Sequence, residues 1–189
     1  WIHLNSIDYN ESLDLIAISS RKMNEFYFID HSTTTEEAAT SLGGNYNKGG
    51  EFIYRWGNPQ NYNRGEEEDQ QLISQHSVNW IDDNHPGAGD IILFNNRTEE
   101  IGSEILQIRT PVTDQEYTLE GNLQHEPDSP IWSYSNGIFF SNIQSGAYRL
   151  QNGNTFISIG NSVNFFEIDS VGNETWNYTF TGPSGQPFN

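Results

Sequence analysis

The chain has 189 residues, 34% of them hydrophobic and 13% aromatic, which is enough apolar material for a globular core. Its formal net charge of −18 comes from 26 acidic and 8 basic residues, and such a surface repels nucleic acid and anionic membranes. There is no cysteine, and no stretch approaches the roughly 18 apolar residues that span a bilayer. The composition therefore argues against a nucleic-acid partner, disulfides and a membrane span.

Short apolar segments bounded by turn residues follow one another in chain order and repeat an order of four strand types three times. The segments are 3–7, 15–19, 25–30 and 52–56, then 76–80, 90–94, 103–108 and 131–134, then 146–150, 155–159, 164–169 and 175–178. The second segment of each repeat is a continuous apolar run, which is typical of a strand buried on both faces. The fourth carries a tryptophan each time.

Four antiparallel strands repeated in order predict an all-β fold, a β-propeller built of four-stranded blades. The approximate blades are 1–60, 74–136 and 144–181. A plain β-sandwich is the alternative, and it explains the strands but not their repeated order. The chain holds about three to four blades, and the three that the repeats define cannot close a ring by themselves, because propellers have about 4–8. We therefore expect a partial chain whose ring is completed by further sequence, self-association or a partner.

Two longer insertions interrupt the repeats. Residues 33–41 are predicted to form one or two helical turns. Residues 57–75 are polar, include an acidic run, and are predicted to be a surface loop or a short helix.

Two histidines occupy equivalent positions in consecutive repeats. His3 and His76 each open a first strand, whereas the third repeat has Gly146 near this position. Because the first strand of a blade lines the central channel, both imidazoles are expected at one channel mouth. Paired imidazoles suit proton transfer, metal binding or anion binding. A structural role for each histidine is the alternative.

Polar residues end the second strand of every repeat. They are Arg21, then Asn95, Asn96 and Arg97, and finally Asn161. An arginine is suited to capture sulfate, phosphate or carboxylate through two parallel hydrogen bonds. Ordinary turn chemistry, which asparagine often supplies, is the alternative.

Other motifs in the sequence carry less weight. The Asp82, Asp83, Asn84 and Asp90 cluster offers hard oxygen ligands for calcium, but it lacks EF-hand spacing, so a hairpin loop is favoured and no cofactor is expected. Four Asn-X-Ser/Thr sequons are candidate glycosylation sites if the protein is secreted. They begin at Asn10, Asn96, Asn173 and Asn177. The acidic surface suits a salty setting, and we expect an extracellular or periplasmic protein.

Several pieces of the sequence, in order, resemble the bacterial arylsulfotransferase family. They are His3-Leu-Asn-Ser-Ile-Asp8, Ile18-Ser-Ser-Arg21, Phe28-Ile-Asp-His-Ser-Thr33, Tyr54-Arg-Trp-Gly-Asn-Pro-Gln60, Gln75-His76 and Leu93-Phe-Asn-Asn96. A weaker match covers 145–155. The resemblance implies a six-bladed propeller outside the cytoplasm that moves a sulfuryl group from a phenolic sulfate ester to another phenol, without a nucleotide cofactor.

The resemblance also implies roles for individual residues. His3 and His76 match two channel histidines of the family, and Arg21 matches the arginine of its Ser-Ser-Arg piece. These three are the candidate catalytic residues. The matching pieces contain Asn5, Asn95 and Asn96, which are the candidate substrate-binding residues.

Two departures from the family pattern leave an alternative open. The resemblance places the family's nucleophilic histidine in a later segment, and His125, the last histidine here, matches no catalytic motif. The arginine that follows Phe94-Asn-Asn is shifted or absent relative to the family. The alternative function is a non-catalytic secreted propeller that acts as a binding or assembly module.

Overall fold

The computed structural model describes residues 2–111, 119, 123–137 and 139–181. These residues form twelve strands in three four-stranded antiparallel sheets, each ordered as in the sequence. The first sheet holds β1 (Leu4–Asn10), β2 (Leu15–Ser20), β3 (Glu25–Asp30) and β4 (Tyr54–Trp56). The second holds β5 (His76–Trp80), β6 (Ile91–Asn95), β7 (Glu104–Ile108) and β8 (Trp132–Tyr134). The third holds β9 (Gly146–Arg149), β10 (Thr155–Ile159), β11 (Asn164–Ile168) and β12 (Glu174–Thr179).

The predicted order of four strands, repeated three times, is confirmed, and the two predicted insertions also form short helical turns. The first contains α1 (Thr35–Ala38), which begins at a capping box in which Thr34 and Glu37 satisfy each other's backbone N–H groups. The second contains the 3-10 turns η1 (Pro59–Tyr62) and η2 (Glu67–Asp69). A two-sheet sandwich is wrong for this chain, because the strands form three sheets.

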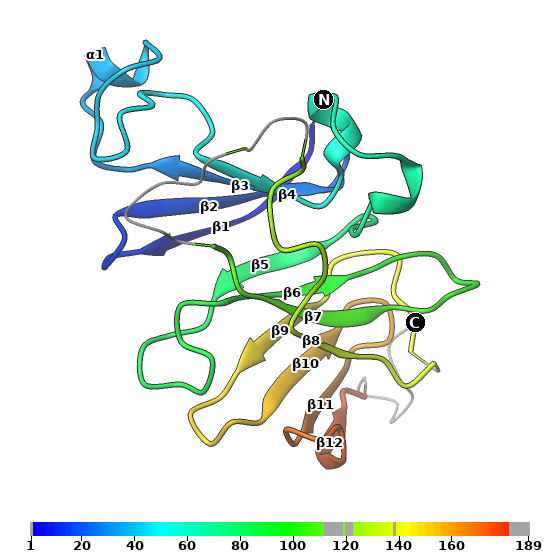
Figure 1. Cartoon of the computed structure of the whole chain (residues 1–189). Helices are drawn as coiled ribbons and strands as arrows, with labels where there is room; N and C mark the ends of the chain where they lie inside the picture. The colour runs from blue at the N-terminus through cyan, green and yellow to red at the C-terminus, as the bar shows by residue number, and fades with distance from the viewer. Residues whose placement is uncertain (1, 112–118, 120–122, 138, 182–189) are drawn as a thin grey trace.

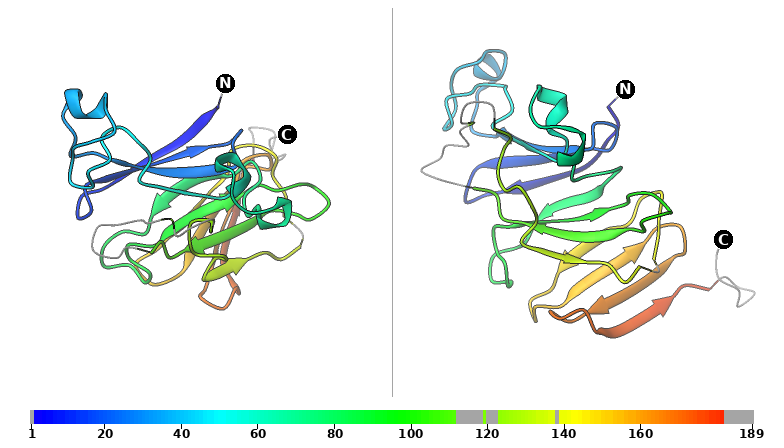
Figure 2. Two further views of the ribbon diagram at one scale, coloured as in Figure 1. Left: turned by 45° about the horizontal axis from the view of Figure 1, so that its top comes forward. Right: turned by 45° about the vertical axis from the view of Figure 1, so that its right-hand side comes forward.

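The three sheets are stacked, with the second between the other two (Figures 1 and 2). Its β6 is therefore buried at every position: Leu93 belongs to the core shared with the first sheet, and Phe94 to the core shared with the third. In β2 and β10, buried residues largely alternate with partly exposed ones. Burial on both faces was thus predicted correctly for β6 and wrongly for the other two, because only the middle sheet is covered twice.

The first strands of the sheets are the elements that approach one another. Strand β5 contacts both β1 and β9. Two side chains of β1 accept hydrogen bonds from the β5 backbone: Ser6 Oγ lies 3.0 Å from Val78 N, and Asp8 Oδ2 lies 2.8 Å from Trp80 N. These bonds bring the ends of the first strands together, and with them the residues singled out by the sequence.

The two outermost faces of the stack carry exposed apolar side chains. On the first sheet, Ile7 is 73% exposed, and on β12 of the third sheet Trp176 and Tyr178 are 46% and 49% exposed. The described strands do not close a ring, and the sheets form an open stack (Figure 2). Within the described ranges, no helix has the length and apolar character needed to cross a bilayer.

Candidate functional site

His76 begins β5 and is buried, with 9% of its surface exposed. Its Nδ1 lies 2.7 Å from Asn96 Oδ1. The amide of Asn96 points its Nδ2 at two carbonyl oxygens, those of Ser141 at 2.7 Å and Gln144 at 3.2 Å, so the Asn96 Oδ1 must be the acceptor. The proton of a neutral His76 therefore sits on Nδ1, and Nε2 keeps its lone pair.

The pKa of His76 is lowered from its ordinary value. Burial is the largest cause, and the hydrogen bond to Asn96 and a smaller effect of the Ser74 backbone partly oppose it. The positive charges of Arg21 and His3 lower the pKa further, which places both side chains within electrostatic reach of His76. The lowered pKa favours the neutral form of His76, and Arg21 and His3 lie near enough to influence it.

Arg21 follows β2 and is half-buried. It donates one hydrogen bond from Nη2 to the Asn142 carbonyl at 3.2 Å, across to the segment that precedes β9. In the described part of the chain, no carboxylate forms an ion pair with Arg21. A guanidinium has five N–H donors, so the single bond to Asn142 leaves donors of Arg21 that could bind an anion.

Gln75 fixes the backbone immediately before His76. Its Nε2 donates to Ser19 Oγ at 3.0 Å and to the Glu25 carbonyl at 2.8 Å, and its own carbonyl accepts a 2.7 Å bond from Asn5 Nδ2. Asn5 therefore ties β1 to β5 beside the site.

Non-glycine residues with left-handed backbone occur where all three first strands begin. The φ angles are 53° at His3, 54° at Ser77 and 80° at Ser145. Such angles cost free energy for L-residues and persist only where the surroundings enforce them, which is common at functional sites. The strand openings that hold His3 and His76 are therefore specially shaped in each repeat.

The family model described as "Arylsulfotransferase (ASST)" matches residues 1–181. The chain belongs to the arylsulfotransferase family. No curated protein matches it. The family match covers all three sheets. It includes His3 and His76 at the openings of first strands and Arg21 after the end of β2.

Two of the predicted substrate-binding residues of this arylsulfotransferase-family chain are fully buried. Asn95 accepts from the Ile73 amide at 2.8 Å and donates to the Gln71 carbonyl at 2.9 Å, which pins the segment before β5. Asn96 positions His76, as described above. Both asparagines therefore act on the protein backbone and on His76 in this structure, and only Asn5 is partly exposed.

The remaining predicted sites lie elsewhere. Asp90 of the suggested calcium cluster is bound by Gln107 at 2.6 Å and by Arg109 at 3.0 Å, and no group of three or more metal-binding side chains is found in the described ranges. Among the sequons, Asn96 is buried with its amide engaged, which leaves no space for a glycan. Of the other three sequon asparagines, Asn10 is partly exposed, and Asn173 and Asn177 are exposed.

The segment before β9 is the part of the site that the sequence did not reveal. The Ser141 and Gln144 carbonyls hold Asn96, and the Asn142 carbonyl receives Arg21. Every residue has a backbone carbonyl oxygen, whatever its side chain. The residue types in this segment therefore could not have indicated these contacts.

Proposed function

We propose that this protein transfers a sulfuryl group from an aryl sulfate ester to a phenolic acceptor, with His76, rather than a histidine in a later segment, as the transiently sulfated residue. The observation that carries the proposal is the fixed tautomer of His76: Nδ1 is bound to Asn96, so Nε2 is the ring nitrogen with a lone pair. The lowered pKa keeps that lone pair free of a proton at neutral pH. His76 thus has the properties that a nucleophilic histidine requires.

In the first half-reaction, Nε2 attacks the sulfur of the ester. The N–S bond forms as the bond between sulfur and the phenolic oxygen breaks, and the phenolate leaves with the bonding electrons. Negative charge on the sulfuryl oxygens is met by the Arg21 guanidinium, and His3 is the neighbouring group that can donate a proton to the leaving phenolate. In the second half-reaction, the acceptor phenol oxygen attacks sulfur, the N–S bond breaks and the acceptor loses its proton.

The local charge suits an anionic donor despite the net charge of −18. Arg21 supplies a permanent positive charge close enough to His76 to lower the pKa of His76. A guanidinium beside the reacting group attracts an anion more strongly than distant, solvent-screened carboxylates repel it.

We propose that the three sheets are consecutive blades, approximately 1–60, 74–136 and 144–181, of a propeller whose axis runs beside the first strands. The contacts of β5 with both β1 and β9 support this arrangement, as do the apolar side chains on the two outer faces, which a neighbouring blade would cover. A periplasmic or extracellular location is proposed with it, from the family.

The test is turnover of 4-nitrophenyl sulfate in the presence of phenol, together with mass spectrometry of the protein trapped without acceptor. We expect release of 4-nitrophenol and one added sulfuryl group on the peptide that contains His76. His76→Ala should lose at least about a thousandfold in turnover. Full turnover by His76→Ala would overturn the assignment of the nucleophile, and a folded wild-type protein without turnover would favour the non-catalytic module.

A further inference from the structure

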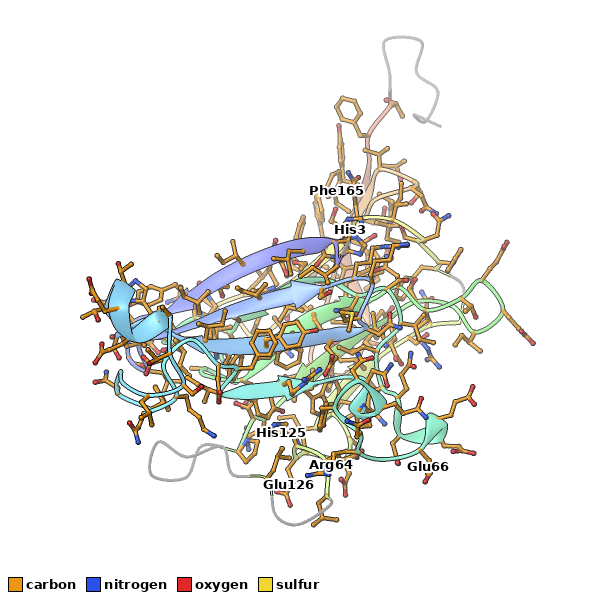
Figure 3. The ribbon with its side chains drawn as sticks, turned by 90° about the horizontal axis from the view of Figure 1, so that it is seen from above. His3, Arg64, Glu66, His125, Glu126 and Phe165 are labelled. Atoms are coloured by element: carbon orange, nitrogen blue, oxygen red, sulfur yellow. The ribbon has the colours of Figure 1, made fainter. Side chains whose placement is uncertain are left out.

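A pocket of about 430 Å³ lies at the outer edge of the first sheet, away from His76. It is lined by residues that include Phe52, Arg55, Tyr62, Arg64 and His125. Arg55 lies in β4, the fourth strand of its sheet, whereas His3 precedes β1, so three strand spacings, or roughly 14 Å, separate the two edges. Figure 3 shows His125 and Arg64 at one side of the sheet and His3 at the other.

The walls of the pocket are aromatic. The Tyr54 hydroxyl donates to the Glu126 carbonyl at 2.7 Å and Trp56 Nε1 donates to the Pro127 carbonyl at 2.7 Å, which docks the connection between β7 and β8 on β4. His125 is thereby buried against the ring of Tyr62, at a centroid distance of 5.7 Å. Phe52 is 47% exposed at the pocket, so an aromatic surface remains open to a ligand.

The two arginines of the pocket differ in what they already bind. Arg55 donates from Nε and Nη2 to the buried carboxylate of Glu25, at 2.9 and 2.7 Å, so its charge is compensated. Within the described ranges, Arg64 has a buried Nε without a hydrogen-bond partner, and its Nη1 makes only a long contact of 3.5 Å with the Asn63 carbonyl. Within the described residues, Arg64 forms no ion pair.

A second unsatisfied group lies beside Arg64. Gln124 Oε1 is buried and accepts no hydrogen bond from the part of the chain that the structure describes, and it is close to Gly65, where an added Cβ would come within 3.1 Å of it. Buried polar groups without partners are uncommon in folded proteins, because each costs about 1–3 kcal/mol. Among the described residues, a guanidinium without an ion pair lines this aromatic pocket and an unpartnered acceptor lies near the next residue, Gly65, so the two observations point to a polar ligand.

We propose that this pocket binds a small aromatic molecule that carries one anionic group, at a site separate from His76. The ring of the ligand packs against Phe52 and Tyr62, and its anionic group accepts hydrogen bonds from the Arg64 guanidinium. The volume of about 430 Å³ lies in the range of ligand pockets and holds a single substituted ring with water. The exposed carboxylate of Glu51 at the rim disfavours a dianion. This inference does not depend on the proposed sulfuryl transfer.

The test uses 4-hydroxybenzenesulfonate, whose carbon–sulfur bond prevents sulfuryl transfer, and isothermal titration calorimetry. All titrations use protein that carries Arg21→Gln, because this change weakens binding of the probe next to His76. We expect this variant to bind the probe at one site. Adding Arg64→Gln should weaken the affinity for the probe about tenfold or more, since a charge-assisted hydrogen bond is lost. Lys22→Gln removes an exposed cation outside the pocket, and adding it instead should leave the affinity unchanged.

A second measurement does not depend on the folding of a variant. In the wild-type protein, nuclear Overhauser contacts are expected between the ring protons of the probe and the rings of Phe52 and Tyr62. The absence of those contacts, or binding in the Arg21→Gln background that Arg64→Gln leaves unchanged, would overturn the proposal. Loss of turnover in His76→Ala with the probe still bound at Arg64 would show that the two sites are separate.

Discussion

Asn96 Oδ1 lies 2.7 Å from His76 Nδ1, and the same asparagine donates from Nδ2 to two carbonyl oxygens in the segment before β9. The second and third sheets thus cooperate to hold one tautomer of one histidine. This relationship makes Asn96 a positioning residue, since it acts on the proposed chemistry only through His76.

Asn96→Ala should lower turnover about 10- to 100-fold, because the His76 ring loses the bond that fixes its tautomer. The same change should lower the His76 pKa further, because the bond to Asn96 raises it. A pH titration of the imidazole by NMR checks this. Asn95→Ala is the matched control: Asn95 is equally buried but binds backbone near β5, so it should destabilise the fold without moving the His76 pKa. Equal pKa values in the two variants would contradict the assigned role.

Arg21→Gln should raise the KM for an aryl sulfate about 10- to 100-fold, because the proposed anion contact is lost. It should also raise the His76 pKa, since the Arg21 charge lowers it. Steady-state kinetics and an NMR titration measure the two effects separately. Lys22→Gln removes the adjacent exposed charge and should change KM less than threefold. An unchanged KM in Arg21→Gln would place the donor elsewhere.

Arg55→Met should destabilise the protein by about 3–5 kcal/mol, because it leaves the Glu25 carboxylate buried without its cation. Glu25 is fully buried and accepts hydrogen bonds from Arg55 and Asn61. Urea unfolding gives the free energy of unfolding. The double variant Glu25→Gln with Arg55→Met should recover part of the loss, since no unpaired charge remains. A single variant costing under about 1 kcal/mol would show that the buried carboxylate is satisfied without Arg55.

The stability of the protein should fall as the pH decreases from about 6.5 to about 4, in part because of His125. Burial, with smaller effects of Arg55 and Lys48, lowers the His125 pKa to about 4. In this window the unfolded chain binds a proton at His125 and the folded chain does not, so acid favours unfolding. One such proton contributes at most about 1.4 kcal/mol per pH unit. His125→Gln should reduce the measured slope, and an unchanged slope would contradict the lowered pKa.

Leu93→Ala should cost about 2–5 kcal/mol, because this fully buried side chain packs between the first and second sheets. Ile7→Ala is its counterpart on the outer face of the first sheet, where the side chain is 73% exposed, and should cost under about 0.5 kcal/mol. Chemical denaturation compares the two. A large cost at Ile7 would mean that another sheet covers this face in solution.

The repeat of four strands was readable because alternating or continuous apolar runs and turn residues are local signals. β5, β3 and β10 have the predicted bounds, whereas β4 is shorter than predicted, starting at Tyr54 rather than Phe52. The sequence of a single strand could not predict whether other sheets cover both of its faces. β2 and β6 are both rich in apolar residues. Of these two strands, β6 lies in the middle sheet, which has a neighbouring sheet on each face, whereas β2 lies in an outer sheet.

For the site, the equivalent strand openings led to the prediction of His3 and His76, and the end of the second strand led to the prediction of Arg21; the catalytic roles of all three stay predictions. Their closeness follows from the contacts of the first strands. The burial of Asn95 and Asn96 and their bonds to the backbone could not be predicted, because burial, rather than residue type, decides whether an amide reaches a ligand or the backbone.

The sequence by itself determined the strands, their antiparallel order and the residue types near the strand openings, because these depend on periodicity and turn chemistry within short segments. Only the tertiary structure decided which sheet is buried twice, which tautomer His76 adopts, and that His125, which matches no motif, lies in an aromatic pocket beside Arg64. Those properties depend on groups up to 72 residues apart, such as Tyr54 and Glu126, and such distances in sequence carry no local signal.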